Sequence, residues 1–162
     1  MKSRVLMAAA LVVSFVPAAQ AQVSPGPDKV FVTKAAASNM FEIESSKVAL
    51  TMAGNAEVKA FAQQMITDHE KAGQDLVAVA GDAVPRELDA PHLARLEKLK
   101  TTAPADFDAA YLDEQVLAHD EAVTLFTKYS EEANAPALKT FASKTLPVLK
   151  GHQEHVRQLD KM

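Results

Sequence analysis

Apolar and polar positions follow the period of an α-helix along almost the whole chain. From residue 28 onward, apolar side chains recur every three or four positions, the spacing of a helix that buries one face. The pattern is interrupted at Gly54-Asn55, at Gly81 and at Asn134-Ala135-Pro136, which are residue types that end and start helices. Strand-like alternation is absent over any useful length. The sequence therefore predicts an all-α protein. Its four long helices run over about 28–53, 56–80, 106–133 and from 136 nearly to the C-terminus.

A long segment separates the second predicted helix from the third. Residues 82–105 contain three prolines and one short helical stretch, His92 to Lys100. At ~3.3 Å per residue this segment reaches roughly 80 Å, more than a helix of about 25 residues at 1.5 Å rise. The second helical hairpin can therefore start from the opposite end of the first, as in ferritin-like proteins. We predict a single domain over residues 28–160, a ferritin-like four-helix bundle with the long crossover between helices two and three.

Three of the five histidines lie at the centre of predicted inward faces: His69, His119 and His152. Each belongs to a different helix and is spaced by three or four positions from apolar neighbours. A buried imidazole needs a hydrogen-bond partner or a metal ion, so the pattern predicts a polar site inside the bundle. It does not name a reaction. On the first helix the inward face is predicted to contain Phe31, Lys34, Ser38, Phe41, Ser45, Val48 and Met52.

The N-terminus has the three parts of a secretory signal. Lys2 and Arg4 precede an apolar run from Val5 to Val16, and Ala19-Gln20-Ala21 is a small-x-small cleavage site. We expect cleavage after Ala21, a flexible lead over 22–27 and export to a bacterial periplasm; a retained N-terminal anchor is the alternative. The run is shorter than the about 20 residues that a spanning helix needs, and no later segment is continuously apolar.

Charge and cysteine content narrow the classes of partner and cofactor. Removal of residues 1–21 takes away Lys2 and Arg4, so that 17 basic and 21 acidic side chains become 15 and 21, a net charge of −6. An acidic chain without a basic cluster is a poor candidate for binding nucleic acid or an anionic membrane surface. The chain has no cysteine, which excludes disulfides and thiolate metal sites. Protein partners and the oligomeric state are not indicated.

Several motifs resemble the bacterial family called domain of unknown function 4142. They are Phe61-Ala62-x-x-Met65-x-x-Asp68-His69, Phe107-Asp108-x-x-Tyr111, His119, and Leu146-Pro147 followed by His152. The resemblance implies an envelope protein with a ferritin-like bundle and no established activity. It also implies that Glu42 is the matching acid of the first helix. Helical geometry alone does not decide between Glu42 and Glu44, which flank the predicted inward face on opposite sides.

Together, Glu42, His69, His119 and His152 could surround one metal ion in the bundle core. Imidazole and carboxylate ligands suit zinc, iron, copper or manganese. Asp68, Asp120 and Glu121 lie near the histidines in sequence and could in principle orient the rings, although adjacent residues on a helix point about 100° apart.

A ferritin-type di-iron centre is not expected from this sequence. Such centres use Glu-x-x-His on two helices, whereas Ile66 and Leu149 stand three residues before His69 and His152. We find no nucleophile–base pair, phosphate loop or glycine-rich cofactor motif, which argues against an ordinary hydrolase, kinase or dehydrogenase.

Two function classes follow, with an enzyme of another type a distant third. In the first, the protein binds or responds to a metal ion through the core histidines. In the second, it is a non-enzymatic structural or stress-associated envelope protein whose histidines form a polar network that fixes helix register. Ring nitrogens about 3–5 Å apart around one point, with a carboxylate beside them, would favour the first class. Rings more than ~8 Å apart, each with its own partner, would favour the second.

Overall fold

The computed structural model describes residues 26–162, and within them all regular structure is helical. The elements are α1 (Pro27–Met52), α2 (Ala56–Ala80), the short 3-10 turn η1 (Gly81–Ala83), α3 (Ala90–Lys100), α4 (Phe107–Glu132) and α5 (Pro136–Leu159). The expected signal peptide and residues 22–25 of the expected lead lie outside the described residues. In the described part of the chain, no helix combines the length and apolar character needed to cross a membrane.

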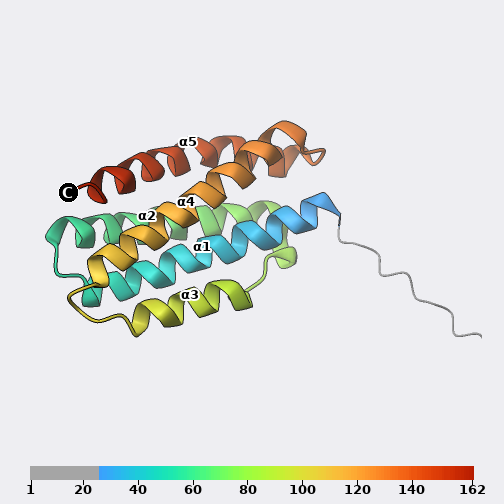
Figure 1. Cartoon of the computed structure of the whole chain (residues 1–162). Helices are drawn as coiled ribbons and strands as arrows, with labels where there is room; N and C mark the ends of the chain where they lie inside the picture. The colour runs from blue at the N-terminus through green and yellow to red at the C-terminus, as the bar shows by residue number, and fades with distance from the viewer. Residues whose placement is uncertain (1–25) are drawn as a thin grey trace, which may run out of the picture.

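The four long helices form the predicted bundle of two hairpins. α1 and α2 run antiparallel, α4 and α5 run antiparallel, and α2 and α4 run in the same direction (Figure 1). Around the bundle, α1 packs on α2 and α4, and α5 packs on the same two helices. The parallel direction of α2 and α4 requires the long crossover, which contains α3. The predicted fold class, with its crossover between the second and third long helices, is confirmed.

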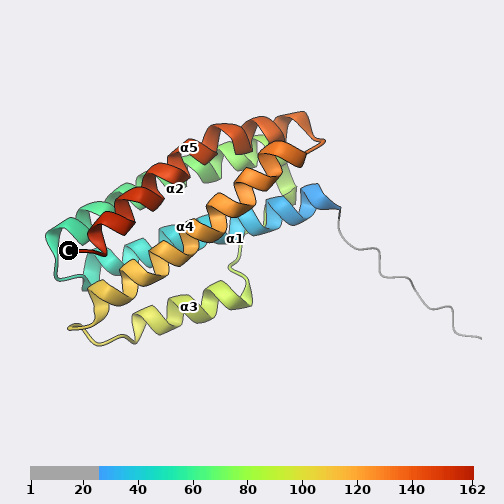
Figure 2. The same ribbon diagram turned by 45° about the horizontal axis from the view of Figure 1, so that its top comes forward.

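The crossover helix α3 lies outside the four long helices, against α1 and α4 (Figures 1 and 2). Arg95 anchors it: the guanidinium donates to Glu114 Oε2 at 2.6 Å and lies 4.6 Å from the ring centroid of Phe41. Leu96 and Leu99 of α3 are buried in the same apolar cluster as Phe41. α3 therefore covers a third side of α1.

Helix ends follow the predicted stop and start residues, with two exceptions in capping. Asn55 accepts a hydrogen bond from Glu57 N at 2.8 Å, and Gly81 has a φ of 57°, which favours glycine. Asp28 and Asp106 stand at the starts of two predicted helices, where aspartate commonly caps, and neither caps its helix. Asp28 lies inside the first turn of α1 and accepts a hydrogen bond from Tyr129, and Asp106 makes no side-chain cap hydrogen bond.

Asp108 joins the first turn of α4 to the turn between α1 and α2. Its carboxylate accepts hydrogen bonds from Gly54 N at 3.0 Å and from Asn55 N at 2.8 Å. We expect Asp108→Ala to lower the free energy of unfolding by about 1–2 kcal/mol, because two backbone donors lose a charged acceptor. Asp106→Ala is the matched control and should change it by less than about 0.5 kcal/mol. Urea denaturation followed by circular dichroism measures both, and equal effects would contradict the assignment.

The inward face of α1 differs from the one predicted. Lys34 is exposed, and Val48 and Met52 are only half-buried. Alanines fill much of the buried surface instead, because α2, α3 and α4 all contact α1 and cover more than one stripe of it. The buried residues of α1 are Phe31, Val32, Ala35, Ala36, Ala37, Phe41, Glu42, Ser45, Ser46 and Ala49.

The bundle core consists of two apolar clusters with a polar layer between them. One cluster, which includes Phe41, Phe61 and Tyr111, lies toward the turn between α1 and α2. The other, which includes Phe31, Phe126 and Phe141, lies toward the opposite end. In sequence, each of the three core histidines falls between residues of the first cluster and residues of the second. The fold therefore places all three at mid-height of the bundle.

Candidate metal centre

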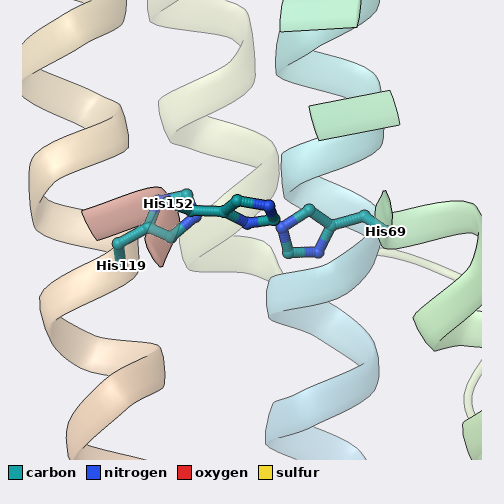
Figure 3. Close-up of side chains that lie close together, drawn as sticks. All are labelled: His69, His119 and His152. Carbon is teal, nitrogen blue, oxygen red and sulfur yellow. The ribbon is translucent and has the colours of Figure 1, made fainter. Parts of the chain in front are cut away.

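His69, His119 and His152 converge at the middle of the bundle from three helices. They project from α2, α4 and α5, and their rings point toward one another (Figure 3). The ring centroids are 5.9 Å apart for His69 and His119, 5.6 Å for His69 and His152, and 5.5 Å for His119 and His152. One ring nitrogen of each lies within 4.8 Å of the others. The side chains are 5%, 1% and 3% exposed, so the group is closed to bulk solvent.

Each ring uses one nitrogen on an oxygen outside the group. His69 Nδ1 lies 3.1 Å from Asn39 Oδ1, and His119 Nδ1 lies 2.9 Å from the backbone carbonyl of Gln115. His152 Nε2 lies 2.8 Å from Asp68 Oδ2. An amide oxygen, a backbone carbonyl and a carboxylate only accept hydrogen bonds, so each of these outer nitrogens is the donor and carries the proton. These contacts assign the tautomer of all three rings.

The second nitrogen of each ring is buried without a hydrogen-bond partner among residues 26–162. These inner nitrogens are His69 Nε2, His119 Nε2 and His152 Nδ1. With the proton on the outer nitrogen, each inner nitrogen presents a lone pair. A buried polar atom left unsatisfied costs about 1–3 kcal/mol, and native proteins rarely tolerate several together. A cation between the rings would satisfy all three at once, as metal-bound imidazoles with oriented outer nitrogens do.

Burial keeps two of the rings in the form that binds metal. Burial lowers the pKa of His69 well below its usual value of 6.5, and the neighbouring His119 and His152 lower it further. The pKa of His152 is also lowered, mainly by burial, although its hydrogen bond to Asp68 acts in the opposite direction. Both rings are therefore neutral near pH 7. Only neutral imidazole coordinates a metal ion, so neither of these two rings needs to lose a proton to bind one.

The lowered pKa of His69 predicts a pH-dependent stability difference in the metal-free protein. The folded state keeps its full stability at pH values above the unfolded pKa near 6.5. As pH falls below that value, the unfolded chain binds a proton at His69 that the folded chain does not, so the free energy of unfolding decreases. Burial raises the pKa of Glu42, which changes stability in the opposite sense, so wild type alone is not diagnostic. We expect the stability of His69→Leu relative to wild type to grow from pH 7.5 to 5.5, by at most about 1.4 kcal/mol per pH unit. Urea denaturation in EDTA at both values measures it, and a constant difference would contradict the neutral, buried ring.

Glu42, the fourth expected ligand, lies beside the group and not within it. It is 2% exposed, and its Oε1 lies 3.7 Å from His119 Nδ1, the outer nitrogen of that ring. Neither carboxylate oxygen has a hydrogen-bond partner in the described chain. Glu44 instead pairs with Lys47 at 2.8 Å on the surface. Between the two acids, Glu42 therefore faces the interior, at a position from which it contacts His119 from behind.

A row of buried polar side chains continues from Glu42 along the bundle. Gln115 Nε2 donates to Ser45 Oγ at 3.2 Å, and the hydroxyls of Ser46 and Tyr111 are 2.9 Å apart. Burial raises the pKa of Tyr111 far above its usual value, so this phenol stays protonated. These residues extend the polar layer without adding a nitrogen or carboxylate to the group of three histidines.

The acids expected to orient the rings are distributed differently. Asp68 is next to His69 in sequence, yet it binds His152 of another helix. Asp120 accepts from Gln153 and Arg157, and Glu121 accepts from Arg95, so neither contacts a ring of the group. Of the three acids that could orient a ring, only Asp68 therefore hydrogen-bonds to one. Asn39, which the sequence did not single out, takes that role for His69.

Comparison with known proteins adds a family and a fold. Residues 14–159 match the model of a family described as "Domain of unknown function (DUF4142)". Among solved structures, the chain is similar to the crystal structure of a DUF305 fragment from Deinococcus radiodurans. The TM-score is 0.71 at 13% identity, over 85% of this chain and 97% of that chain. At this identity the likeness shows the fold alone. No curated protein matches the chain.

Proposed function

The chain belongs to the family described as domain of unknown function (DUF4142), and we propose that it binds a single transition-metal ion between His69, His119 and His152. The observation that carries this proposal is the pairing pattern of the three rings. Every outer nitrogen is held by an acceptor, whereas every inner nitrogen is buried without a partner in the described chain. A polar network built only for stability would pair the inner nitrogens as well.

The spacing of the rings suits an ion after a small contraction. Three nitrogens no more than 4.8 Å apart have a common central point at most about 2.8 Å from each, and zinc–imidazole bonds are about 2.0–2.1 Å. Each ring would therefore need to move inward by no more than roughly 0.7 Å on binding. Three imidazoles favour zinc, copper or iron over manganese, which prefers oxygen ligands. With Glu42 behind His119, the protein supplies three ligands, and a tetrahedral ion would need one further ligand, such as a bound water molecule.

The ion would join the two hairpins of the bundle. His69 belongs to the α1–α2 hairpin, and His119 and His152 belong to the α4–α5 hairpin. A bond from the ion to each side therefore links segments that are far apart in sequence. Metal binding of this kind stabilises the folded state, because the unfolded chain does not present the three nitrogens together.

Metal content tests this proposal against the structural alternative. The protein is purified without a histidine tag and without chelator, and its metals are measured by mass spectrometry of the elements. We expect about one zinc, copper or iron per chain. Substoichiometric metal, combined with no thermal shift on adding zinc, copper, iron or manganese, would favour a non-enzymatic protein whose polar layer sets helix register.

We further propose that the chain is exported and cleaved after Ala21. This part rests on the N-terminal sequence: the basic residues, the apolar run and the small-x-small site. Intact-mass analysis of the protein from its native host is expected to give a chain that begins at Gln22. A mature chain that retains Met1 or Lys2 would refute cleavage.

A further inference from the structure

We propose that Gly73 is a positioning residue of the metal centre, because the absence of a side chain there lets the Asn39 amide hold His69. Asn39 is on α1, and Gly73 is on α2, four residues and about one turn after His69. The expected effect on metal affinity rests on the function proposed above. The expected effect on the His69 ring does not, since it is measurable without metal.

A side chain at position 73 would collide with Asn39. A Cβ built on Gly73 lies 2.9 Å from Asn39 Nδ2 and 3.9 Å from its Cγ. The shorter distance is well inside the about 3.5 Å of an ordinary van der Waals contact. The amide can move away from such a Cβ, because it is the end of a flexible, half-buried side chain. The collision therefore displaces the amide and leaves the backbone in place.

Displacement of the amide reaches His69 directly. Nδ2 and Oδ1 of Asn39 belong to one planar group, and Oδ1 is the atom 3.1 Å from His69 Nδ1. Among residues 26–162, the Asn39 side chain makes this one hydrogen bond, so no second hydrogen bond holds the amide in position. A donor–acceptor distance beyond about 3.5 Å is no longer a hydrogen bond. The inner nitrogen His69 Nε2 then competes for the proton, and a protonated nitrogen does not coordinate metal.

Glycine at this position also opposes the preference of the helix around it. Glycine in a helix interior is less favourable than alanine, and Gly73 lies well inside α2. Asn39 borders a cavity of about 20 Å³ against His69, and also an open pocket between α1, α2 and η1. The amide of Asn39 therefore lies between the His69 ring and the open pocket. The glycine at position 73 leaves room for the amide to stay close to the ring.

Two glycine-to-alanine variants give a matched comparison. Gly151 lies in the interior of α5, and a Cβ there meets no atom within 4 Å. Gly151→Ala should raise the Tm by about 2–4 °C and leave the Kd for zinc unchanged. Gly73→Ala brings the same gain in helix preference, but it should raise the Kd for zinc about 10-fold or more. The Tm of the metal-free protein should not fall, so the loss of affinity is not a result of unfolding. Competition with a chromophoric zinc chelator measures both affinities.

A double-mutant cycle shows whether Gly73 acts through Asn39. Asn39→Ala should itself raise the Kd for zinc about 10-fold, because His69 loses its acceptor. In that background Gly73→Ala should have no further effect, since no amide remains to be displaced. An equal effect of Gly73→Ala in both backgrounds would overturn the proposal.

The metal-free protein separates failure of this inference from failure of the proposed function. Two-bond ¹H–¹⁵N spectra report the tautomer of His69: we expect the Nδ1–H form in wild type and a shift toward the Nε2–H form in Gly73→Ala. That shift in a protein that binds no zinc would support the positioning role and reject the metal site. Normal zinc binding with an unchanged tautomer in Gly73→Ala would reject the positioning role and leave the metal site intact.

Discussion

We expect zinc, at a free concentration 1,000-fold above its Kd, to raise the Tm of the metal-free protein by about 10–20 °C. At that excess, a ligand that binds only the folded state adds about 4.1 kcal/mol. For domains of this size, each kcal/mol at the transition shifts the Tm by several degrees. The unfolded chain competes weakly, because the three histidines come from helices separated by long stretches of sequence. Differential scanning calorimetry with and without EDTA measures the shift.

Histidine variants show whether the shift arises at the proposed centre. His119→Ala removes one of three ligands and should abolish most of the stabilisation by zinc. His155→Ala is the matched control, because His155 lies on α5 near His152 but contacts Phe61, with ring centroids 5.2 Å apart. We expect this variant to keep the full zinc-dependent shift. Loss of the shift in His155→Ala, or its persistence in His119→Ala, would place zinc at another site.

The second large effect concerns the metal-free protein, which replacement of a core histidine by leucine is expected to stabilise. We expect His69→Leu and His152→Leu each to raise the free energy of unfolding in EDTA by about 1–3 kcal/mol at pH 7.5. Each wild-type ring holds a buried inner nitrogen without a partner in the described chain, and leucine of similar size removes that penalty. The acceptors left behind can be hydrated, since Asn39 is half-buried and the Asp68 side chain is 36% exposed.

This comparison separates the two function classes by the direction of the change. In a metal site without its ion, the buried ring nitrogens lack a partner and lower the stability of the protein. Apolar replacements should therefore stabilise the metal-free protein while they remove zinc binding. A structural polar layer stabilises the metal-free protein through its hydrogen bonds, so the same replacements would lower the free energy of unfolding. Chemical denaturation in EDTA measures the change, and a loss of more than about 1 kcal/mol in both variants would contradict a metal centre.

The fold could be predicted from the sequence because the residues that start and end the helices act locally. Asn55, Gly81 and Pro136 stand where helices start or stop, and each acts through the backbone of its own turn. The histidine spacing was likewise local, because three- and four-residue periods place a side chain on a helix face without reference to other helices. The buried face of α1 was not readable, because alanine gives a weak apolar signal and α3 covers a side that the bundle alone would leave open.

The partners of the histidines depended on how the helices meet. Asp68 and His152 are 84 residues apart, and only the packing of α2 on α5 brings them to 2.8 Å. In the sequence, Asn39 is one of several polar residues on α1. Its role as acceptor for His69 depends on the positions of His69 and Gly73 on the facing helix. The position of Glu42 behind His119 depends on the rotation of α1 about its own axis, which residue spacing does not determine.

Anomalous diffraction from crystals of the zinc-loaded protein tests the central claim most directly. Data collected on either side of the zinc absorption edge locate the ion without reference to the protein density. We predict a single peak inside the bundle, about 2.0–2.1 Å from each of three atoms: His69 Nε2, His119 Nε2 and His152 Nδ1. A bundle centre without a peak, with zinc bound only to surface carboxylates or to His155, would contradict the assignment of these three histidines as a metal centre.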